Sequence, residues 1–184
     1  MSTPMRWIAA VAIALVYLVP TSARSTQIPY RSIESMGADS PFVVRGQVSE
    51  VRSFWNDNRS RILTEISVTV SERYKGASPA EVRIVQMGGV LDGVRMTVAG
   101  SLEWVPGEDV VVFLEDSLPG RYRVAGFTQG KFAVQRDPRT GEEYVVQAGL
   151  GNVELVGATR ALTPGRIPLT DLLGEALPEL QGGE

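Results

Sequence analysis

The chain has 184 residues with 18 basic and 21 acidic side chains, and it contains no cysteine and no histidine. The mild acidic balance argues against a nucleic-acid-binding surface, which needs concentrated positive charge. The two missing residue types exclude disulfides, Ser-His-Asp and Cys-His nucleophile arrangements, and almost every protein zinc or copper site.

The first 23 residues have the features of a secretory signal peptide. Arg6 supplies the positive charge, twelve apolar residues follow, and Thr21 and Ala23 occupy the −3 and −1 positions of a cleavage site. We expect cleavage after Ala23, because the apolar run is shorter than the roughly 20 residues of a membrane span. The mature chain then has 17 basic and 21 acidic residues, a net charge of −4, since only Arg6 is lost. We expect an exported protein, periplasmic or secreted, without a membrane span.

Residues 24–40 are predicted to form a short helical lead-in. Ile33 and Met36 are three residues apart, and Gly37 is expected to stop the helix before Pro41. The segment at 41–150 has a different character, because apolar residues now recur at every second position. We therefore expect the barrel domain to occupy 41–150.

The first two strand patterns are long. Alternating residues predict a strand at 42–48, and Val51 on the other parity indicates a bulge near Ser49 and Glu50. A polar loop, RSFWNDNRSR, is expected before the next strand. That strand has a predicted inward face rich in β-branched side chains: Ile62, Thr64, Ile66, Val68 and Val70.

The apolar run VVVFL at 110–114 indicates a central strand that is buried on both faces. Short strands recur about every ten residues, with turn signals such as Pro106-Gly107 between them. This spacing predicts an all-β fold, a small OB-like (Greek-key) barrel or sandwich with short helical segments at both ends. The extension at 151–184 is expected to hold one short amphipathic helix, capped by Thr170 or Asp171, and a frayed tail.

Four glycines lie within the stretch MGGVLDGVRMTVAGS at 87–101. Gly88 and Gly93 have the spacing of a phosphate-binding loop, but Val94 and Arg95 replace its lysine and its hydroxyl residue. The residues that follow alternate as in a strand, whereas a phosphate loop leads into a helix. We therefore predict a strand that bends, and no cofactor site.

Paired acids flank the central apolar run, Glu108-Asp109 before it and Glu115-Asp116 after it. Adjacent residues of a strand point to opposite faces, so neither pair forms a catalytic dyad by sequence alone. We expect solvent-facing turn charges. A hydrolase that uses carboxylates such as Glu108 or Asp116 stays an alternative, which requires two acids in one cleft and a raised pKa on one of them.

The residue types that are present allow two further chemistries. Lys131 or Lys75 could form a Ser-Lys pair if it were buried beside a serine, although we expect Lys131 on the outer face of a strand. Asn56, Asp57 and Asn58 offer oxygen ligands for calcium, but no glutamate follows at the twelfth position, so a plain polar turn is expected. We expect no metal, no cofactor and no catalytic residue.

Three aromatic residues are candidates for contacts with a partner: Trp55, Tyr74 and Trp104. Trp55 lies in the expected polar loop, and loop aromatics on a β scaffold are common contact residues. Trp104 precedes the Pro-Gly turn and has an alternative role as a plug of the barrel end.

About residues 38–135 resemble uncharacterised exported bacterial β-barrel proteins. The stretches that carry this resemblance are DSPFVVRGQVSEV, SERYKG, WVPGEDVVVFLED and QGKF. A looser similarity, the Lys75-Gly76 pair after a long strand, connects the chain to netrin-like domains, including tissue inhibitors of metalloproteinases. This resemblance implies a five-stranded OB-type barrel. It does not imply protease inhibition, because those inhibitors use an N-terminal cysteine and disulfides that are missing here.

The expected function is that of a non-enzymatic binding or interaction module of the bacterial cell envelope. A protein or peptide partner is favoured over nucleic acid. The alternatives are the carboxylate-dependent hydrolase and a structural subunit of an extracellular assembly held by strand edges, with the oligomeric state left open.

Overall fold

The structure is a computed structural model that describes residues 26–149, 153–157 and 165–181. The expected signal peptide and its cleavage after Ala23 lie outside these residues. Within them, none of the helices is long and apolar enough to span a bilayer.

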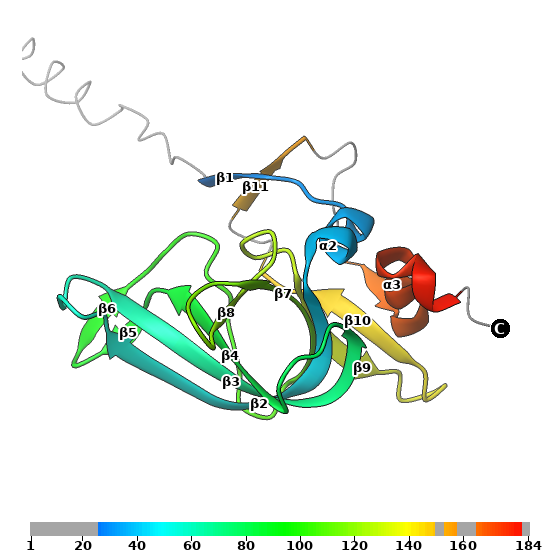
Figure 1. Cartoon of the computed structure of the whole chain (residues 1–184), viewed down its shortest axis with the longest axis horizontal. Coiled ribbons are helices and arrows are strands. Elements are labelled where there is room, and N and C mark those ends of the chain that lie inside the picture. Colours follow the sequence, from blue (N-terminus) through cyan, green and yellow to red (C-terminus); the bar gives the residue numbers. More distant parts are fainter. Residues whose placement is uncertain (1–25, 150–152, 158–164, 182–184) are drawn as a thin grey trace, which may run out of the picture.

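Five strands close into a small barrel (Figure 1). They are β2 (Phe42–Trp55), β3 (Ile62–Lys75), β4 (Glu81–Met87), β7 (Asp109–Asp116) and β8 (Tyr122–Val124). The first three are antiparallel neighbours in chain order, and β7 returns to the free edge of β2, which is a Greek-key order. β8 pairs with the end of β7 and meets β4 in parallel, and this contact closes the ring. The predicted all-β fold and small OB-like barrel are confirmed.

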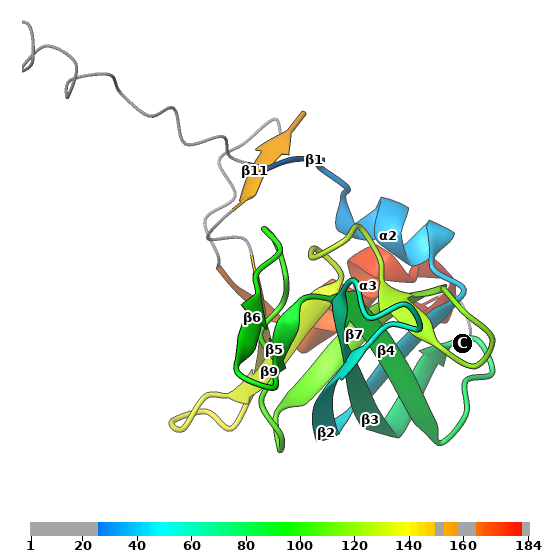
Figure 2. The ribbon, with the colours of Figure 1, turned by 90° about the vertical axis from the view of Figure 1, so that its left-hand side faces the viewer.

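A side sheet extends from the first half of β7. It contains β9 (Lys131–Arg136), β10 (Glu143–Gln147) and β12 (Arg166–Pro168), so the C-terminal extension adds a strand to this sheet. The helices α2 (Ile33–Asp39) and α3 (Leu169–Ala176) lie against each other beside it (Figure 1). β1 (Thr26–Pro29) and β11 (Val153–Val156) form a separate parallel pair away from the barrel (Figure 2).

β7 separates two hydrophobic cores, as its unbroken apolar run predicted. One face of the strand, with Val110, Val112 and Leu114, fills the barrel interior. The other face, with Val111 and Phe113, packs under the two helices and against the side sheet. The predicted inward face of β3 is also confirmed, because its first four members are buried and Val70 is partly buried.

The helices correct three expectations. α2 runs through Asp39, so Gly37 does not stop it; Gly37 is the contact point with α3, where an added Cβ would lie 1.9 Å from the carbonyl oxygen of Ala176. α3 begins directly after Pro168 and has no side-chain cap, so neither Thr170 nor Asp171 caps it. The tail continues as a 3₁₀ helix, η2 (Pro178–Gln181), where fraying was expected.

The predicted bulge in β2 is confirmed by a register shift between Val48 and Glu50. β2 nevertheless continues to Trp55, so the expected polar loop is shorter than predicted, because residues 51–55 still pair with β3. The glycine stretch bends as expected, at Gly88 and Gly89 with positive φ, but it then forms a hairpin. Its strands are β5 (Gly89–Leu91) and β6 (Val94–Met96).

Candidate binding cleft

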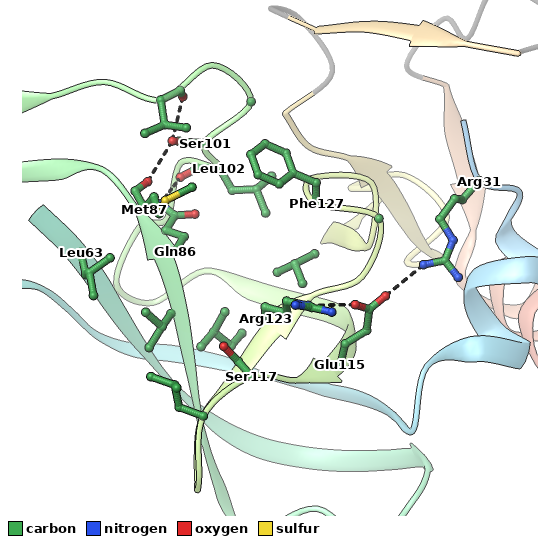
Figure 3. Close-up of a pocket in the computed structure, with 17 residues that line it drawn as sticks. Arg31, Leu63, Gln86, Met87, Ser101, Leu102, Glu115, Ser117, Arg123 and Phe127 are labelled. Carbon is green, nitrogen blue, oxygen red and sulfur yellow. Dashed lines mark hydrogen bonds and ion pairs between the residues drawn. The ribbon is translucent and has the colours of Figure 1, made fainter. Parts of the chain in front are cut away.

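An apolar cleft opens in the barrel wall between β4 and β8 (Figure 3). The two parallel strands meet only at Ile84 and Tyr122. Beyond this contact no strand of the described chain fills the space between them, and a cleft of about 660 Å³ remains. This volume lies within the range of pockets that hold a small ligand or the anchoring side chains of a larger partner.

The floor of the cleft is part of the barrel core. It is formed by the buried side chains of Ile84, Leu102 and Val124. Large apolar side chains also surround the mouth, where Leu118 is 53% exposed, Phe127 is 47% exposed and Met87 is partly exposed. Clustered exposed apolar side chains around a concave surface are characteristic of interaction sites.

Phe127 is presented on a rigid turn. Its backbone has a φ of 66°, which is unusual for a residue other than glycine. The neighbouring Gln129 is fully buried; its side chain accepts from the backbone of Arg31 and donates to the carbonyls of Pro29 and Gly126. The ring of Phe127 lies against Gly100, where an added Cβ would come within 2.8 Å of it. The turn therefore fixes an aromatic side chain in a partly exposed position.

One end of the cleft is polar and carries two arginines on either side of one glutamate (Figure 3). Glu115 accepts from Arg31 Nη1 at 3.0 Å and from Arg123 Nε at 2.9 Å. Arg31 is also paired with Asp39. Arg123 is 61% exposed, and its Nη1 and Nη2 donate to no residue in the described part of the chain. Two donors at the rim are therefore available to a ligand.

The aromatic residues singled out in the sequence lie elsewhere. Trp55 is at the end of β2, where its Nε1 donates to Asp92 at 3.1 Å and so links β2 to the turn of the β5–β6 hairpin. Trp104, the third candidate for partner contacts, is buried in the barrel core, and its Nε1 donates to Gln86. It matches the alternative role as a plug. The partner-binding role of Trp55 stays a prediction.

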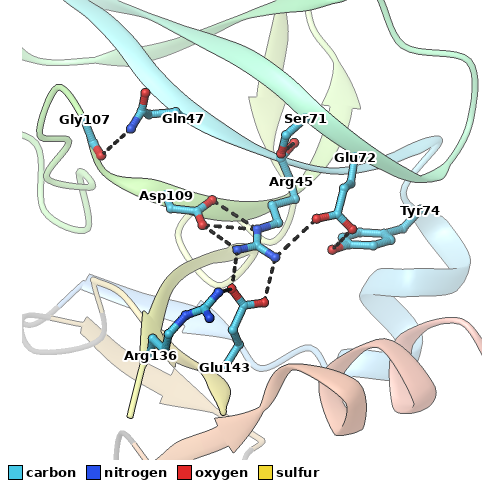
Figure 4. A network of polar contacts seen from close by, with 9 residues as sticks. All are labelled: Arg45, Gln47, Ser71, Glu72, Tyr74, Gly107, Asp109, Arg136 and Glu143. Atoms are coloured by element: carbon cyan, nitrogen blue, oxygen red, sulfur yellow. Dashed lines mark hydrogen bonds and ion pairs between the residues drawn. The ribbon is translucent and has the colours of Figure 1, made fainter. Parts of the chain in front are cut away.

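Tyr74 lies beside a polar network on β3 (Figure 4). Its hydroxyl donates to Glu72 at 3.0 Å. Burial of the hydroxyl is the larger cause, and the hydrogen bond to Glu72 the smaller one, of a rise in the pKa of Tyr74 to about 12. At the centre of the network, Arg45 donates to the carboxylates of Asp109, Glu143 and Glu72. Its hydrogen bonds to Glu143 and Asp109 raise the pKa of Arg45. A partner-binding role for Tyr74 also stays a prediction.

Lys131 is not on the outer face of a strand, as expected, but buried at the end of the barrel. Its Nζ donates to both carboxylate oxygens of Glu108 and to the carbonyl of Glu103, and lies 4.4 Å from the centre of the Trp104 ring. Burial lowers the pKa of Lys131, and the bonds to Glu108 oppose this effect. All three ammonium hydrogens have acceptors, and none of these acceptors is a serine. The arrangement is therefore that of a structural ion pair.

Three of the four paired acids take part in ion pairs, whereas Asp116 is exposed to solvent, as expected. Glu108 binds Lys131, Asp109 binds Arg45, and Glu115 binds two arginines. These three carboxylates lie in separate ion pairs and do not converge. Glu115 is the one carboxylate that lines the β4–β8 cleft among the described residues.

The Asn56–Asn58 turn holds its polar side chains in local bonds. Asn56 Oδ1 accepts from the backbone N–H groups of Ser60 and Arg61, and Asn58 Oδ1 accepts from Ser60. Asp57 is exposed. In the ranges that the structure covers, no group of three or more His, Cys, Asp or Glu side chains could hold a metal ion.

Sequence reasoning missed the cleft. The available signal is a phenylalanine in the turn GFTQG and a leucine in the turn SLPGR, since both are apolar residues at turn positions. The fold and the cleft define the chain as a small all-β barrel with an open, apolar site in its wall. Its sequence matches no protein-family model, and a comparison with curated proteins gives no match.

Proposed function

We propose that the protein is an exported, non-enzymatic binding module of the bacterial cell envelope, and that it engages a protein or peptide partner through the β4–β8 cleft. The observation that carries this proposal is the presentation of Phe127. A buried glutamine locks the turn, and the turn holds an aromatic ring at the mouth of an apolar cleft in an unfavourable backbone conformation. Such conformations persist where the surroundings impose them and are concentrated at functional sites.

The composition of the cleft favours a peptide over a nucleic acid. Its floor is aliphatic, and its one polar end carries the two arginines Arg31 and Arg123 around Glu115. A nucleic-acid surface would instead need a broad basic patch, whereas the described ion pairs neutralise most arginines locally. Aliphatic and aromatic side chains around a small pocket suit the anchoring side chain of a protein partner.

The hydrolase alternative receives less support from the same cleft. Carboxylate chemistry of the glycosidase type needs two acids that face each other across a substrate. Glu115 has no second carboxylate beside it in the described lining, and both its oxygens accept from arginines. A binding role requires no such pair.

The proposal is tested with a display library of random linear peptides, selected against the mature chain, residues 24–184. A Phe127→Gly variant is the matched bait, because glycine accepts the positive φ and removes only the ring. We expect the wild type to enrich a consensus that the variant fails to retain. Failure to enrich any sequence, or equal enrichment by both baits, would contradict the proposed function.

A further inference from the structure

From the backbone geometry we infer that the cleft receives its partner as an added strand: an extended segment lies between β4 and β8, places an apolar side chain on the floor and offers an adjacent carboxylate to Arg123. This inference rests on the proposed function and specifies its partner. Two strand edges, those of β4 and β8, border the cleft (Figure 3).

The edge of β4 faces the cleft with main-chain groups. On its other side, the N–H of Gly88 donates to the carbonyl of Ile62 in β3. Main-chain groups point to the same side at every second residue of a strand, so the N–H and C=O of Gln86 also point toward β3. The main-chain groups of Val85 and Met87 therefore point toward β8 and the cleft. The carbonyl of Met87 accepts from Ser101 Oγ, which leaves its N–H group on this edge.

The edge of β8 has the same property. Ser117 N–H donates to Arg121 O and Ala125 N–H donates to Phe113 O, so the same alternation directs the polar groups of Arg123 toward β7. The N–H and C=O of Val124 point away from β7, toward the cleft. On that side, no strand of the described residues pairs with Val124. Val124 is itself buried. Main-chain groups at buried positions normally have partners, so this edge has an unmet requirement for hydrogen bonds.

Two strand edges that face each other across a cleft are suited to an extended peptide. A peptide backbone supplies both donors and acceptors, whereas a lipid or an aliphatic ligand would fill the floor and leave these edges unpaired. Because β4 and β8 are in contact at Ile84 and Tyr122 and separate beyond them, the segment would complete the barrel wall on the open side of this contact.

The side-chain preference follows from strand alternation. Val124 points into the barrel core, so its neighbour Arg123 points outward. A segment between the strands alternates in the same way, with one side chain against Ile84, Leu102 and Val124 and the next on the outer surface. The free guanidinium nitrogens of Arg123 lie on that surface and favour a carboxylate. The expected consensus is an apolar residue with aspartate or glutamate directly beside it.

The test uses a synthetic peptide taken from the display consensus and measures its affinity by calorimetry. N-methylation of its anchor residue removes one main-chain donor, and we expect roughly tenfold weaker binding or more. Arg123→Glu is expected to weaken binding by a similar factor. Arg83→Glu is the matched control with little effect, because Arg83 is 58% exposed, makes one ion pair through Nε and does not line the cleft.

Amide hydrogen exchange gives a readout that does not depend on any variant. In the complex we expect slowed exchange at the N–H groups of Val124 and Met87. A peptide that binds equally well after N-methylation, without new protection at these amides, would overturn strand addition and leave the proposed function intact. A protein that binds no peptide would overturn both.

Discussion

The positive φ of Phe127 makes a quantitative prediction for two substitutions at this position. Phe127→Ala removes the ring but leaves a residue with a Cβ in the left-handed conformation. Phe127→Gly removes the ring and also the strain of that conformation, because glycine accepts a positive φ. If the backbone conformation that positions the ring is strained, the two variants differ in stability although both lose the same side-chain contacts.

The expected magnitudes follow from exposure and backbone energetics. The residue is 47% exposed, so about half of the roughly 2–3 kcal/mol for full burial of a phenylalanine is lost in either variant, or about 1–1.5 kcal/mol. The left-handed conformation costs about 1–2 kcal/mol for a residue with a Cβ, and the greater unfolded-state freedom of glycine offsets about 0.5–1 kcal/mol of the gain. We expect Phe127→Gly to be more stable than Phe127→Ala by about 0.5–1 kcal/mol.

Urea unfolding of the mature chain, followed by tryptophan fluorescence, measures both free energies of unfolding. Both variants should lose peptide binding. The glycine variant should therefore be more stable than the alanine variant without binding peptide any better. If the glycine variant is no more stable than the alanine variant, the left-handed backbone of Phe127 stores no strain, and the reasoning that connects this turn to function is refuted.

Three further predictions concern the framework around the cleft. Gly37→Ala should destabilise the fold by about 2 kcal/mol in urea unfolding, although alanine favours a helix, because the new methyl group meets the backbone of α3; an unchanged midpoint would contradict the close packing of the two helices. Lys131→Met should lower the free energy of unfolding by about 3 kcal/mol, because it leaves Glu108 without its cation. Adding Glu108→Gln should recover part of this loss, and a double variant as unstable as Lys131→Met would contradict a stabilising role for the ion pair. The hydrogen bond from Arg45 lowers the pKa of Glu143, so its stabilising contribution is present above the unfolded pKa of about 4.3 and is lost as the pH falls through the lower folded value. Urea midpoints should therefore decline more steeply below about pH 4.3 in the wild type than in Arg45→Met, and parallel declines would contradict this role.

Much of the barrel could be predicted from local patterns. The alternation from Ile62 to Val70 has a period of two and depends on one face being buried, and the run at 110–114 lacks alternation because both faces of β7 are buried. The bulge near Ser49 was visible as a change of parity. These features depend on neighbours in sequence or on burial alone, so the sequence carries them directly.

The cleft could not be predicted in this way. Its walls come from β4 and β8, which are far apart in sequence, and its existence depends on their meeting at a single residue pair. The exposure of Phe127 depends on a backbone conformation that phenylalanine disfavours and that Gln129 imposes through contacts near residue 30. Lys131 is buried because Glu108 and Trp104 receive it, which no local pattern reveals.

The central claim is that the β4–β8 cleft contacts a partner in the cell envelope. The most direct measurement is site-specific photo-crosslinking in producing cells, with a photoreactive phenylalanine at Leu118 and, as the matched control, at Val94, which is 47% exposed and lies outside the cleft. The account predicts that position 118 gives one dominant protein adduct, mapped to a short segment with an apolar residue beside an acidic one, and that position 94 does not. Identical adducts at both positions, or none at position 118, would contradict it.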